Sequence, residues 1–219
     1  MPNSPQPNSQ PLWPDSDRTR ELLAAARDGD RDAVEGLMDR HRDALRKLVH
    51  HRMDRAIGRR VDASDVVQDV LLEASNRLAN YLDQPTLPFH LWLRQLARDR
   101  LIDMHRRHRK AQRRSVDRER PLAARAHSDQ SSLDLVARLA DAELTPAAAS
   151  IRRELQLRFR EAIEDLVEDD REILMMRHFE QLTNSEAAEA LGLSPAAAGM
   201  RHLRALRRLK GQLENSASS

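Results

Sequence analysis

Apolar residues recur at intervals of three and four along most of this sequence, and this spacing constrains the fold more than any other feature. The clearest stripe, in the segment 89–110, comprises Phe89, Trp92, Leu93, Leu96, Ala97 and Met104. Such spacing gathers side chains on one face of an α-helix. No segment shows the alternation of apolar and polar residues, or the Gly-rich turns, that are typical of strands. We therefore predict an all-α fold.

The composition agrees with helices that pack through aliphatic side chains. Aromatic residues make up only 3% of the 219 residues, and there are six glycines. The absence of cysteine excludes disulfides, thiolate catalysis and zinc sites with sulfur ligands. No apolar run has the length of a membrane span, and the N-terminus lacks a signal-peptide pattern. We expect a soluble, cytoplasmic protein that does not insert into a membrane.

Helix breakers and caps outline a first domain of four helices, residues 16–112. The turn around Gly29 separates the first two helices, and Asp62 is a predicted N-cap for the third. Pro85 and Pro88 interrupt the chain before the fourth helix, since proline cannot continue a helix but is accepted where one starts.

A second domain is predicted for residues 145–213, beginning at Thr145, a candidate N-cap that is followed by proline. Residues 113–144 are polar and show no sustained helical period, which predicts a flexible linker. Residues 1–15, rich in Pro, Asn, Ser and Gln, and residues 214–219 are predicted to be disordered tails. The predicted architecture is therefore two small helical domains joined by a flexible linker.

The second domain contains the pattern of a helix-turn-helix. Thr183 and Glu186 have the spacing of a capping box at the start of a short helix, and Gly192 can take the left-handed conformation that ends it. Ser194 and Pro195 then cap and begin a longer, basic helix. This order is typical of DNA-binding helix-turn-helix domains, and an ordinary helical hairpin is the alternative.

Charged residues gather in separate segments, although the net charge is only +2. Residues 89–114 contain nine Lys or Arg against two Asp, and residues 199–210 contain five Lys or Arg and no acid. Residues 161–172 contain seven acids and one Arg, which we interpret as a solvated helix face. Two basic helices far apart in the sequence predict a surface for nucleic acid, and a solvated surface on each is the alternative.

Nothing in the sequence predicts an enzyme or a metal site. No Gly-rich phosphate loop, nucleophile elbow or HExxH pattern occurs. His105 and His108 are one helical turn apart, but arginines surround them and no carboxylate pairs with both. We therefore expect no enzymatic activity, no metal and no cofactor.

Three segments, in this order, carry a resemblance to a known family: "DASDVVQDVLLEA", "FHLWLRQLARDRLIDMHRRHRK" and "DREILMMRHFEQLTNSEAAEALGLS". Together they resemble the extracytoplasmic-function sigma factors of bacterial RNA polymerase, over about residues 20–213. The resemblance implies that the first domain binds core RNA polymerase and opens promoter DNA. It implies that the second domain recognises the upstream promoter element. An anti-sigma factor is a further candidate partner.

The resemblance also implies roles for individual residues. The residues implied for polymerase binding are Asp65, Gln68, Asp69 and Leu72. Those implied for promoter melting are Tyr81, Trp92, Arg94, Arg98, Arg106 and Arg109, the arginines as phosphate contacts. Tyr81, beside the loop 80–88, would stack on an extruded base, with packing inside the domain as the alternative.

The helix-turn-helix supplies the candidate residues for the upstream element, namely Ser194, Ala197, Arg201, Arg204 and Arg208. The start of its second helix, "PAAAGM", offers few side chains able to hydrogen-bond base edges, so we expect phosphate contacts to dominate. The chain departs from the family at His202, where an aliphatic core residue is usual.

Two other classes of protein remain as alternatives. A conventional helix-turn-helix regulator would bind a palindromic duplex tightly by itself. A sigma factor would bind duplex DNA weakly alone and depend on core polymerase. An adaptor that binds protein through the acidic segment would not depend on DNA, and the basic face of the first domain argues against it.

Overall fold

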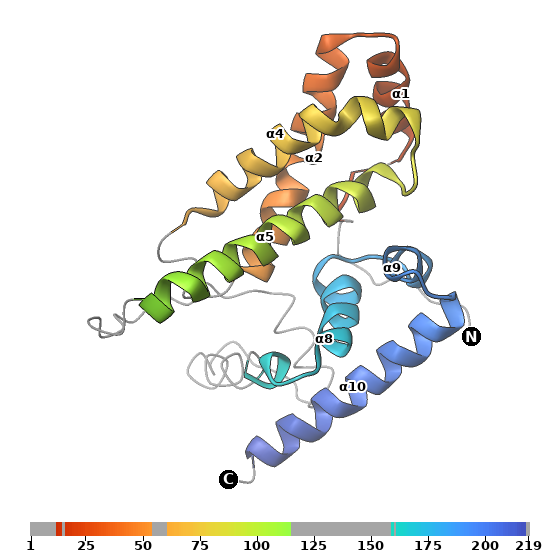
Figure 1. Ribbon diagram of the computed structural model, residues 1–219. Helices are drawn as coiled ribbons and strands as arrows, with labels where there is room; N and C mark the ends of the chain where they lie inside the picture. The colour runs from red at the N-terminus through yellow and green to blue at the C-terminus, as the bar shows by residue number, and fades with distance from the viewer. Residues whose placement is uncertain (1–11, 15, 54–60, 115–158, 160, 218–219) are drawn as a thin grey trace, which may run out of the picture. The chain divides into compact units, whose positions relative to one another are not determined.

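The computed structural model describes residues 12–14, 16–53, 61–114, 159 and 161–217, and the chain divides into two units (Figure 1). The first unit contains α1 (Ser16–Arg27), α2 (Arg31–Arg52), α4 (Ala63–Asp83) and α5 (Phe89–Arg114). The second contains α8 (Glu168–Leu174), the π-helical turn η1 (Met175–Phe179), α9 (Asn184–Leu191) and α10 (Pro195–Ala217). The described residues form helices and no strand, which confirms the all-α prediction. No described helix is both long and apolar enough to span a bilayer.

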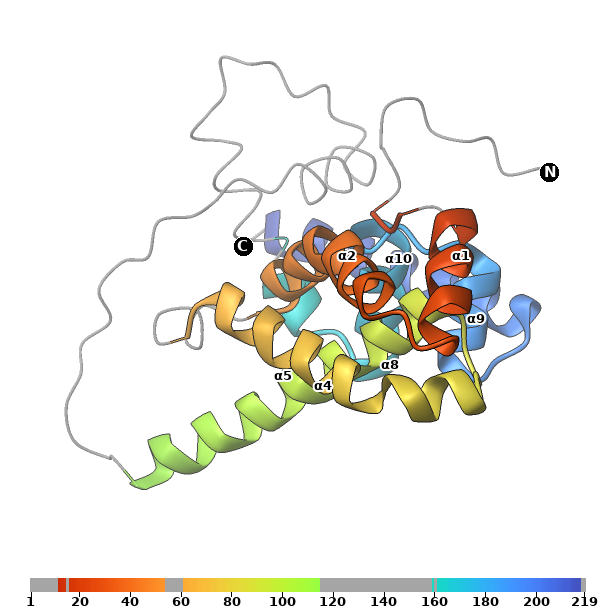
Figure 2. The ribbon, with the colours of Figure 1, turned by 90° about the horizontal axis from the view of Figure 1, so that it is seen from above.

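In the first unit, α4 and α5 run side by side, α2 packs against both, and α1 packs mainly against α2 (Figures 1 and 2). Local signals fix where these helices begin. Gly29, with φ of 90°, forms the turn before α2, and the Asp30 side chain caps that helix. The Asp62 carboxylate caps α4 by accepting a hydrogen bond from the backbone N of Ser64 at 2.8 Å. The predicted turn at Gly29 and cap at Asp62 are therefore confirmed.

An aromatic cluster closes the end of this unit where α4 leads into α5. The rings of Tyr81 and Trp92 stack with centroids 4.6 Å apart, and Phe89 lies 5.5 Å from each. Leu91, outside the predicted apolar stripe, is only 1% exposed. Because α5 contacts both α2 and α4, it is covered on more than one side.

Trp13 shows that the predicted N-terminal tail is too long. Its side chain is buried, with the ring centroid 6.1 Å from that of His41 and 5.8 Å from that of His90. The prediction of disorder through residue 15 is wrong for this residue, since burying a large aromatic ring stabilises the adjacent chain despite its polar composition.

The structure describes only some of the other predicted domain boundaries. Helix α10 continues to Ala217, so the predicted C-terminal tail 214–219 begins too early. The predicted linker 113–144 lies outside the described residues, except for the last two residues of α5. The predicted N-cap Thr145 also lies outside them.

His41 makes the first unit sensitive to acid. Burial, with the nearby charges of His90 and Arg40, lowers the pKa of His41 from 6.5 to about 4. The unfolded chain therefore binds a proton between these pH values that the folded chain does not, and stability falls as the pH falls through this window. We expect unfolding at pH 5 to require about 2 kcal/mol less than at pH 7.5.

Urea titrations followed by tryptophan fluorescence measure this loss. In a His41→Leu variant the loss between the two pH values should be smaller by about the same 2 kcal/mol. An unchanged pH dependence in the variant would contradict the assignment to His41.

The second unit contains the predicted helix-turn-helix. Both hydrogen bonds of the capping box between Thr183 and Glu186 are present at the start of α9. Gly192 ends α9 with φ of 63°, and the Ser194 hydroxyl accepts a hydrogen bond from the backbone of α10 at 3.2 Å. Ala188, at 1% exposed, lets α9 pack closely. The cap, turn and second cap predicted from the sequence are confirmed.

His202, the departure from the family pattern, has a polar partner. Its Nε2 lies 2.9 Å from the Nε2 of His178, in the π-helical turn that continues α8. At this distance one ring nitrogen donates and the other accepts. The imidazole pair thus joins α10 to η1 where an aliphatic contact was expected.

Candidate protein and nucleic-acid interfaces

The residues predicted to bind polymerase lie together on one exposed face of α4. Asp65, Gln68, Asp69 and Leu72 follow one another at intervals of three, one and three residues, and all four are exposed. Leu72 is 63% exposed, the highest value among the large apolar side chains that the structure describes. A leucine exposed within a rim of polar residues offers the apolar centre that a protein interface needs.

A shallow hollow lies beside this leucine and connects α4 to α5. Its lining residues are Asp69, Leu72, Glu73, Asn76, Arg77 and Arg100. Asp69 forms an ion pair with Arg100, and Glu73 forms one with Arg77 at 2.9 Å. These pairs are partly exposed, so each contributes little stability, but together they define the polar rim around Leu72.

The basic face of α5 is smaller than predicted. Arg106 is exposed and Arg98 is partly exposed, whereas the side chain of Arg109 lies outside the described part of the helix. Arg94 is only 3% exposed, so the prediction that it belongs to the exposed face is wrong. The reason is the second buried side of α5, because Arg94 lies one helical turn after the buried Leu91.

Tyr81 packs inside the first unit and is only 8% exposed. Its hydroxyl donates a hydrogen bond to the carbonyl oxygen of Leu87 at 2.9 Å, and its ring stacks on the partly exposed Trp92. Burial raises the pKa of the Tyr81 hydroxyl. In this structure Tyr81 therefore closes the loop before α5, which was the alternative to base stacking.

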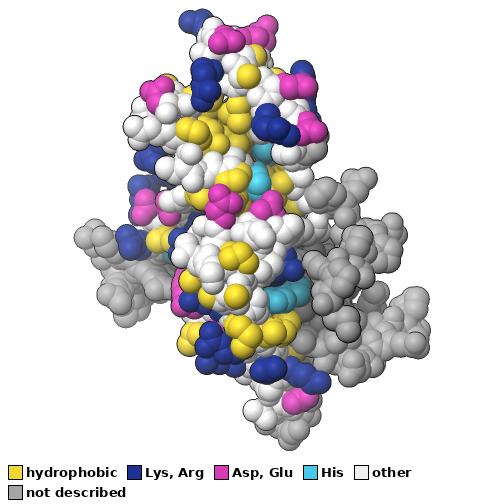
Figure 3. Space-filling view, turned by 90° about the vertical axis from the view of Figure 1, so that its right-hand side faces the viewer, with side chains coloured by type: hydrophobic (Ala, Val, Ile, Leu, Met, Phe, Trp, Pro, Cys, Tyr) yellow, Lys and Arg dark blue, Asp and Glu magenta, His cyan; other side chains and the backbone are white. Residues whose placement is uncertain are grey.

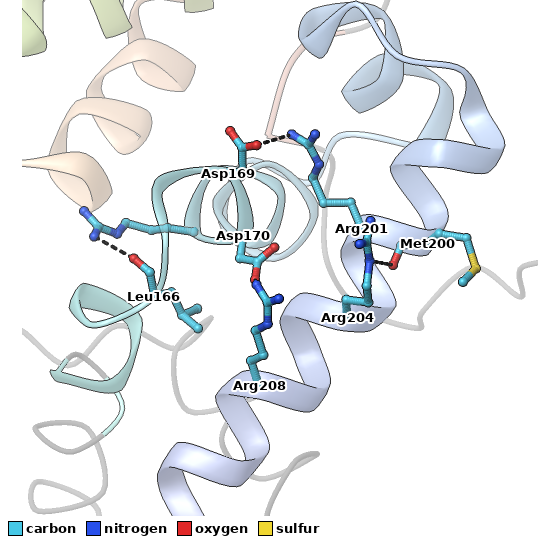
Figure 4. A network of polar contacts seen from close by, with 8 residues as sticks. Leu166, Asp169, Asp170, Met200, Arg201, Arg204 and Arg208 are labelled. Carbon is cyan, nitrogen blue, oxygen red and sulfur yellow. Dashed lines mark hydrogen bonds and ion pairs between the residues drawn. The ribbon is translucent and has the colours of Figure 1, made fainter.

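On α10, two of the three predicted DNA-binding arginines form ion pairs with α8 (Figure 4). Arg201 lies 3.2 Å from Asp169, and Arg208 pairs with Asp170. Arg204, the third, is exposed and bonds only weakly to its own helix, at 3.4 Å. Asp170 is 5% exposed, so the interpretation of the acidic segment as a purely solvated face is wrong.

The structure shows an apolar patch on α10 that the sequence pattern did not predict. Met200 is 55% exposed and Leu203 is 47% exposed, and the predicted contacts Ser194 and Ala197 are exposed too. In Figure 3, apolar and basic side chains lie next to each other over the part formed by α9 and α10. The sequence shows the helical spacing of these apolar residues. The same spacing is typical of a buried stripe, so it does not reveal that this stripe is exposed.

The described residues contain no cluster of three or more His, Cys, Asp or Glu side chains that could bind a metal ion. Two hollows among these residues are shallow and open, one beside Leu72 and one between α10 and the segment before α8. The geometry thus favours contacts with macromolecules over a site for a small substrate.

Comparisons with known proteins agree with this geometry. The family "Sigma-70 region 2" matches residues 37–111, and "Sigma-70, region 4" matches residues 156–209. These matches fall one on each unit and together span more than half of the chain.

Individual relatives carry the same description. The probable RNA polymerase sigma factor RfaY of Xanthomonas campestris pv. campestris is 36% identical over 160 residues, which are 72% of this chain and 36% of RfaY. The ECF RNA polymerase sigma factor SigD of Mycobacterium tuberculosis is 27% identical over 197 residues, covering 90% of this chain and 84% of SigD. This chain therefore spans about a third of the length of RfaY and most of SigD.

A solved structure of CnrH in complex with the cytosolic domain of CnrY has the same fold. The TM-score is 0.56 at 23% identity, over 91% of this chain and 99% of that chain. Both sigma-70 regions are present, in the expected order, and the chain belongs to the extracytoplasmic-function sigma factors of bacterial RNA polymerase.

Proposed function

We propose that this chain binds core RNA polymerase through the exposed face of α4 and directs the enzyme to promoters. The observation that carries the proposal is Leu72, which is 63% exposed within a rim of charged and amide side chains. Leaving a leucine in water is unfavourable, and docking a partner on it recovers the lost hydrophobic free energy. Asp65, Gln68 and Asp69 would fix the orientation of the partner through polar contacts.

The basic face of α5 would contact the promoter backbone where the strands separate. Arg98 and Arg106 offer guanidinium groups to phosphates, and Arg109, whose side chain lies outside the described residues, remains a candidate from the sequence. Strand separation by binding involves no covalent chemistry. Unstacking a base costs a few kcal/mol, which phosphate contacts offset once polymerase supplies the remaining surface.

The second unit would bind duplex DNA of the upstream element through α10. Arg204 and Arg207 are exposed and would contact phosphates. Arg201 and Arg208, in contrast, would mainly hold α10 against α8 through Asp169 and Asp170. The phosphate contacts of this unit are thus fewer than the count of arginines implies.

The proposed task would place the chain in the cytoplasm, where the polymerase acts. CnrH, which shares the fold, is seen in complex with the cytosolic domain of CnrY. By analogy, an inhibitory partner of this chain would compete with polymerase for exposed surfaces such as the α4 face.

The test mixes the purified chain with bacterial core RNA polymerase and genomic DNA fragments. We expect the chain to co-elute with core polymerase and to direct initiation from discrete start sites. A conventional helix-turn-helix regulator would instead leave a footprint on duplex DNA by itself and fail to bind core polymerase. That result would overturn the proposal.

A further inference from the structure

An exposed apolar stripe occupies the start of α10. Ala196, Met200 and Leu203 follow at intervals of four and three residues, so they share one face of the helix. Met200 and Leu203 are about half exposed, at 55% and 47%, although both are of types that proteins usually bury.

The stripe is not the core-facing side of α10, because the opposite face of the helix is buried. Ala198, Ala205 and Leu209, on that opposite face, are all 0% exposed. The start of the helix is also fixed in place, since the Asn184 side chain donates a hydrogen bond to the carbonyl oxygen of Pro195 at 2.8 Å. The stripe is therefore presented outward by a well-anchored helix.

The charges beside the stripe indicate an anionic partner. Arg207 continues the stripe one helical turn further along the same face, and Arg204 flanks it; both are exposed. The first turn of α10 contains no acidic residue. A purely apolar partner would leave these arginines desolvated and unpaired, whereas the major groove of DNA offers phosphates around a floor of base edges.

We propose that Ala196, Met200 and Leu203 recognise the C5-methyl groups of thymines in the major groove of the upstream promoter element. The inference rests on the proposed function and names the chemistry by which this site selects its sequence. In a helix-turn-helix, the N-terminal residues of the second helix contact base edges. Alanine and leucine side chains cannot form hydrogen bonds, and the thymine methyl is the apolar group that the major groove displays.

Methionine suits this role because its flexible thioether adapts to the position of a methyl group. Arginines on the later turns would then bind the flanking phosphates and fix the register of the helix. The upstream element should accordingly contain thymines, on either strand, at the positions under the first two turns of α10.

The test uses holoenzyme reconstituted from the full chain and core polymerase, with a promoter that this holoenzyme selects. Thymines upstream of the melted segment are replaced by deoxyuridine, which lacks the methyl group and keeps every hydrogen-bonding group. We expect promoter affinity to fall about fourfold for each methyl in contact with the stripe. Deoxyuridine placed between the two promoter elements is the matched DNA control and should have no effect.

Two variants assign the effect to Met200. Met200→Leu keeps an apolar contact and should still discriminate thymine from deoxyuridine. Met200→Gln has similar size but a polar end, so it should bind both promoters equally at the affected position. Val167→Gln alters an apolar side chain that is 59% exposed outside α10, and should behave as the unchanged protein.

The possible failures are distinguishable. If no discrete start site is selected, both the proposed function and this inference fail. If the holoenzyme initiates normally but is indifferent to deoxyuridine at every upstream position, only the inference is overturned. Discrimination that survives in Met200→Gln at every position would contradict the assignment of a thymine methyl contact to Met200.

Discussion

Leu72→Lys is expected to lower the affinity of the chain for core RNA polymerase about 100-fold, or about 2.7 kcal/mol. The change removes the main exposed apolar side chain of the α4 face and puts a charge at the centre of the proposed contact, where removing that charge from water is costly. Leucine and lysine have nearly equal helix propensity, so α4 itself should be spared.

Titration of fluorescently labelled protein with core polymerase measures this loss. Ala24→Lys is the matched control, because Ala24 is an exposed apolar residue in a helix of the same unit, on α1, and gains the same charge. The control should bind as the unchanged protein does. Both variants should unfold at the same urea concentration as the parent. Equal affinities of the two variants would exclude the α4 face as the polymerase contact.

The features that the sequence predicted correctly depend on short stretches of chain. Asp62 caps α4 through a residue two positions away, and the capping box of α9 spans three positions. Gly192 takes a conformation that follows from its own lack of a side chain. The four residues predicted for polymerase binding share a face because helical periodicity alone puts them there.

The features that were missed depend on contacts between distant segments. The apolar stripe of α5 predicts Arg94 on the opposite, basic face, and Leu91 and Ile102, outside the stripe, indicate a second covered side without showing which arginine it buries. The structure buries a second side, against elements that periodicity within one helix cannot reveal. Trp13 is a similar case, since a polar segment is anchored by a single ring lying between two histidines from α2 and α5.

The arginines of α10 are another case in which contacts between distant segments could not be predicted from the sequence. Charge counts predict two independent surfaces for the basic helix and the acidic segment, because they do not show which residues meet. In the structure Arg208 pairs with Asp170 across 38 positions of the sequence. This pairing indicates that Arg208 stabilises the second unit, which would not be expected if the residue only bound phosphate.

Arg208→Ala is expected to destabilise the second unit by about 2–3 kcal/mol, because it leaves the carboxylate of Asp170 without its partner. The Asp170 side chain is 7% exposed, whereas that of Arg208 is 57% exposed, so the larger cost arises from the acid. Hydrogen exchange of the α8 and α10 amides measures the free energy of opening this unit separately from the first.

A second substitution separates stability from DNA binding. Asp170→Asn removes the buried charge, so the double variant with Arg208→Ala should recover most of the lost stability. Arg207→Ala is the matched control, an exposed neighbouring arginine whose loss should change stability by less than about 0.5 kcal/mol but weaken promoter binding. If Arg208→Ala instead behaved like Arg207→Ala, and Asp170→Asn rescued nothing, Arg208 would be a phosphate contact. In that case the ion pair with Asp170 would contribute no stability of its own.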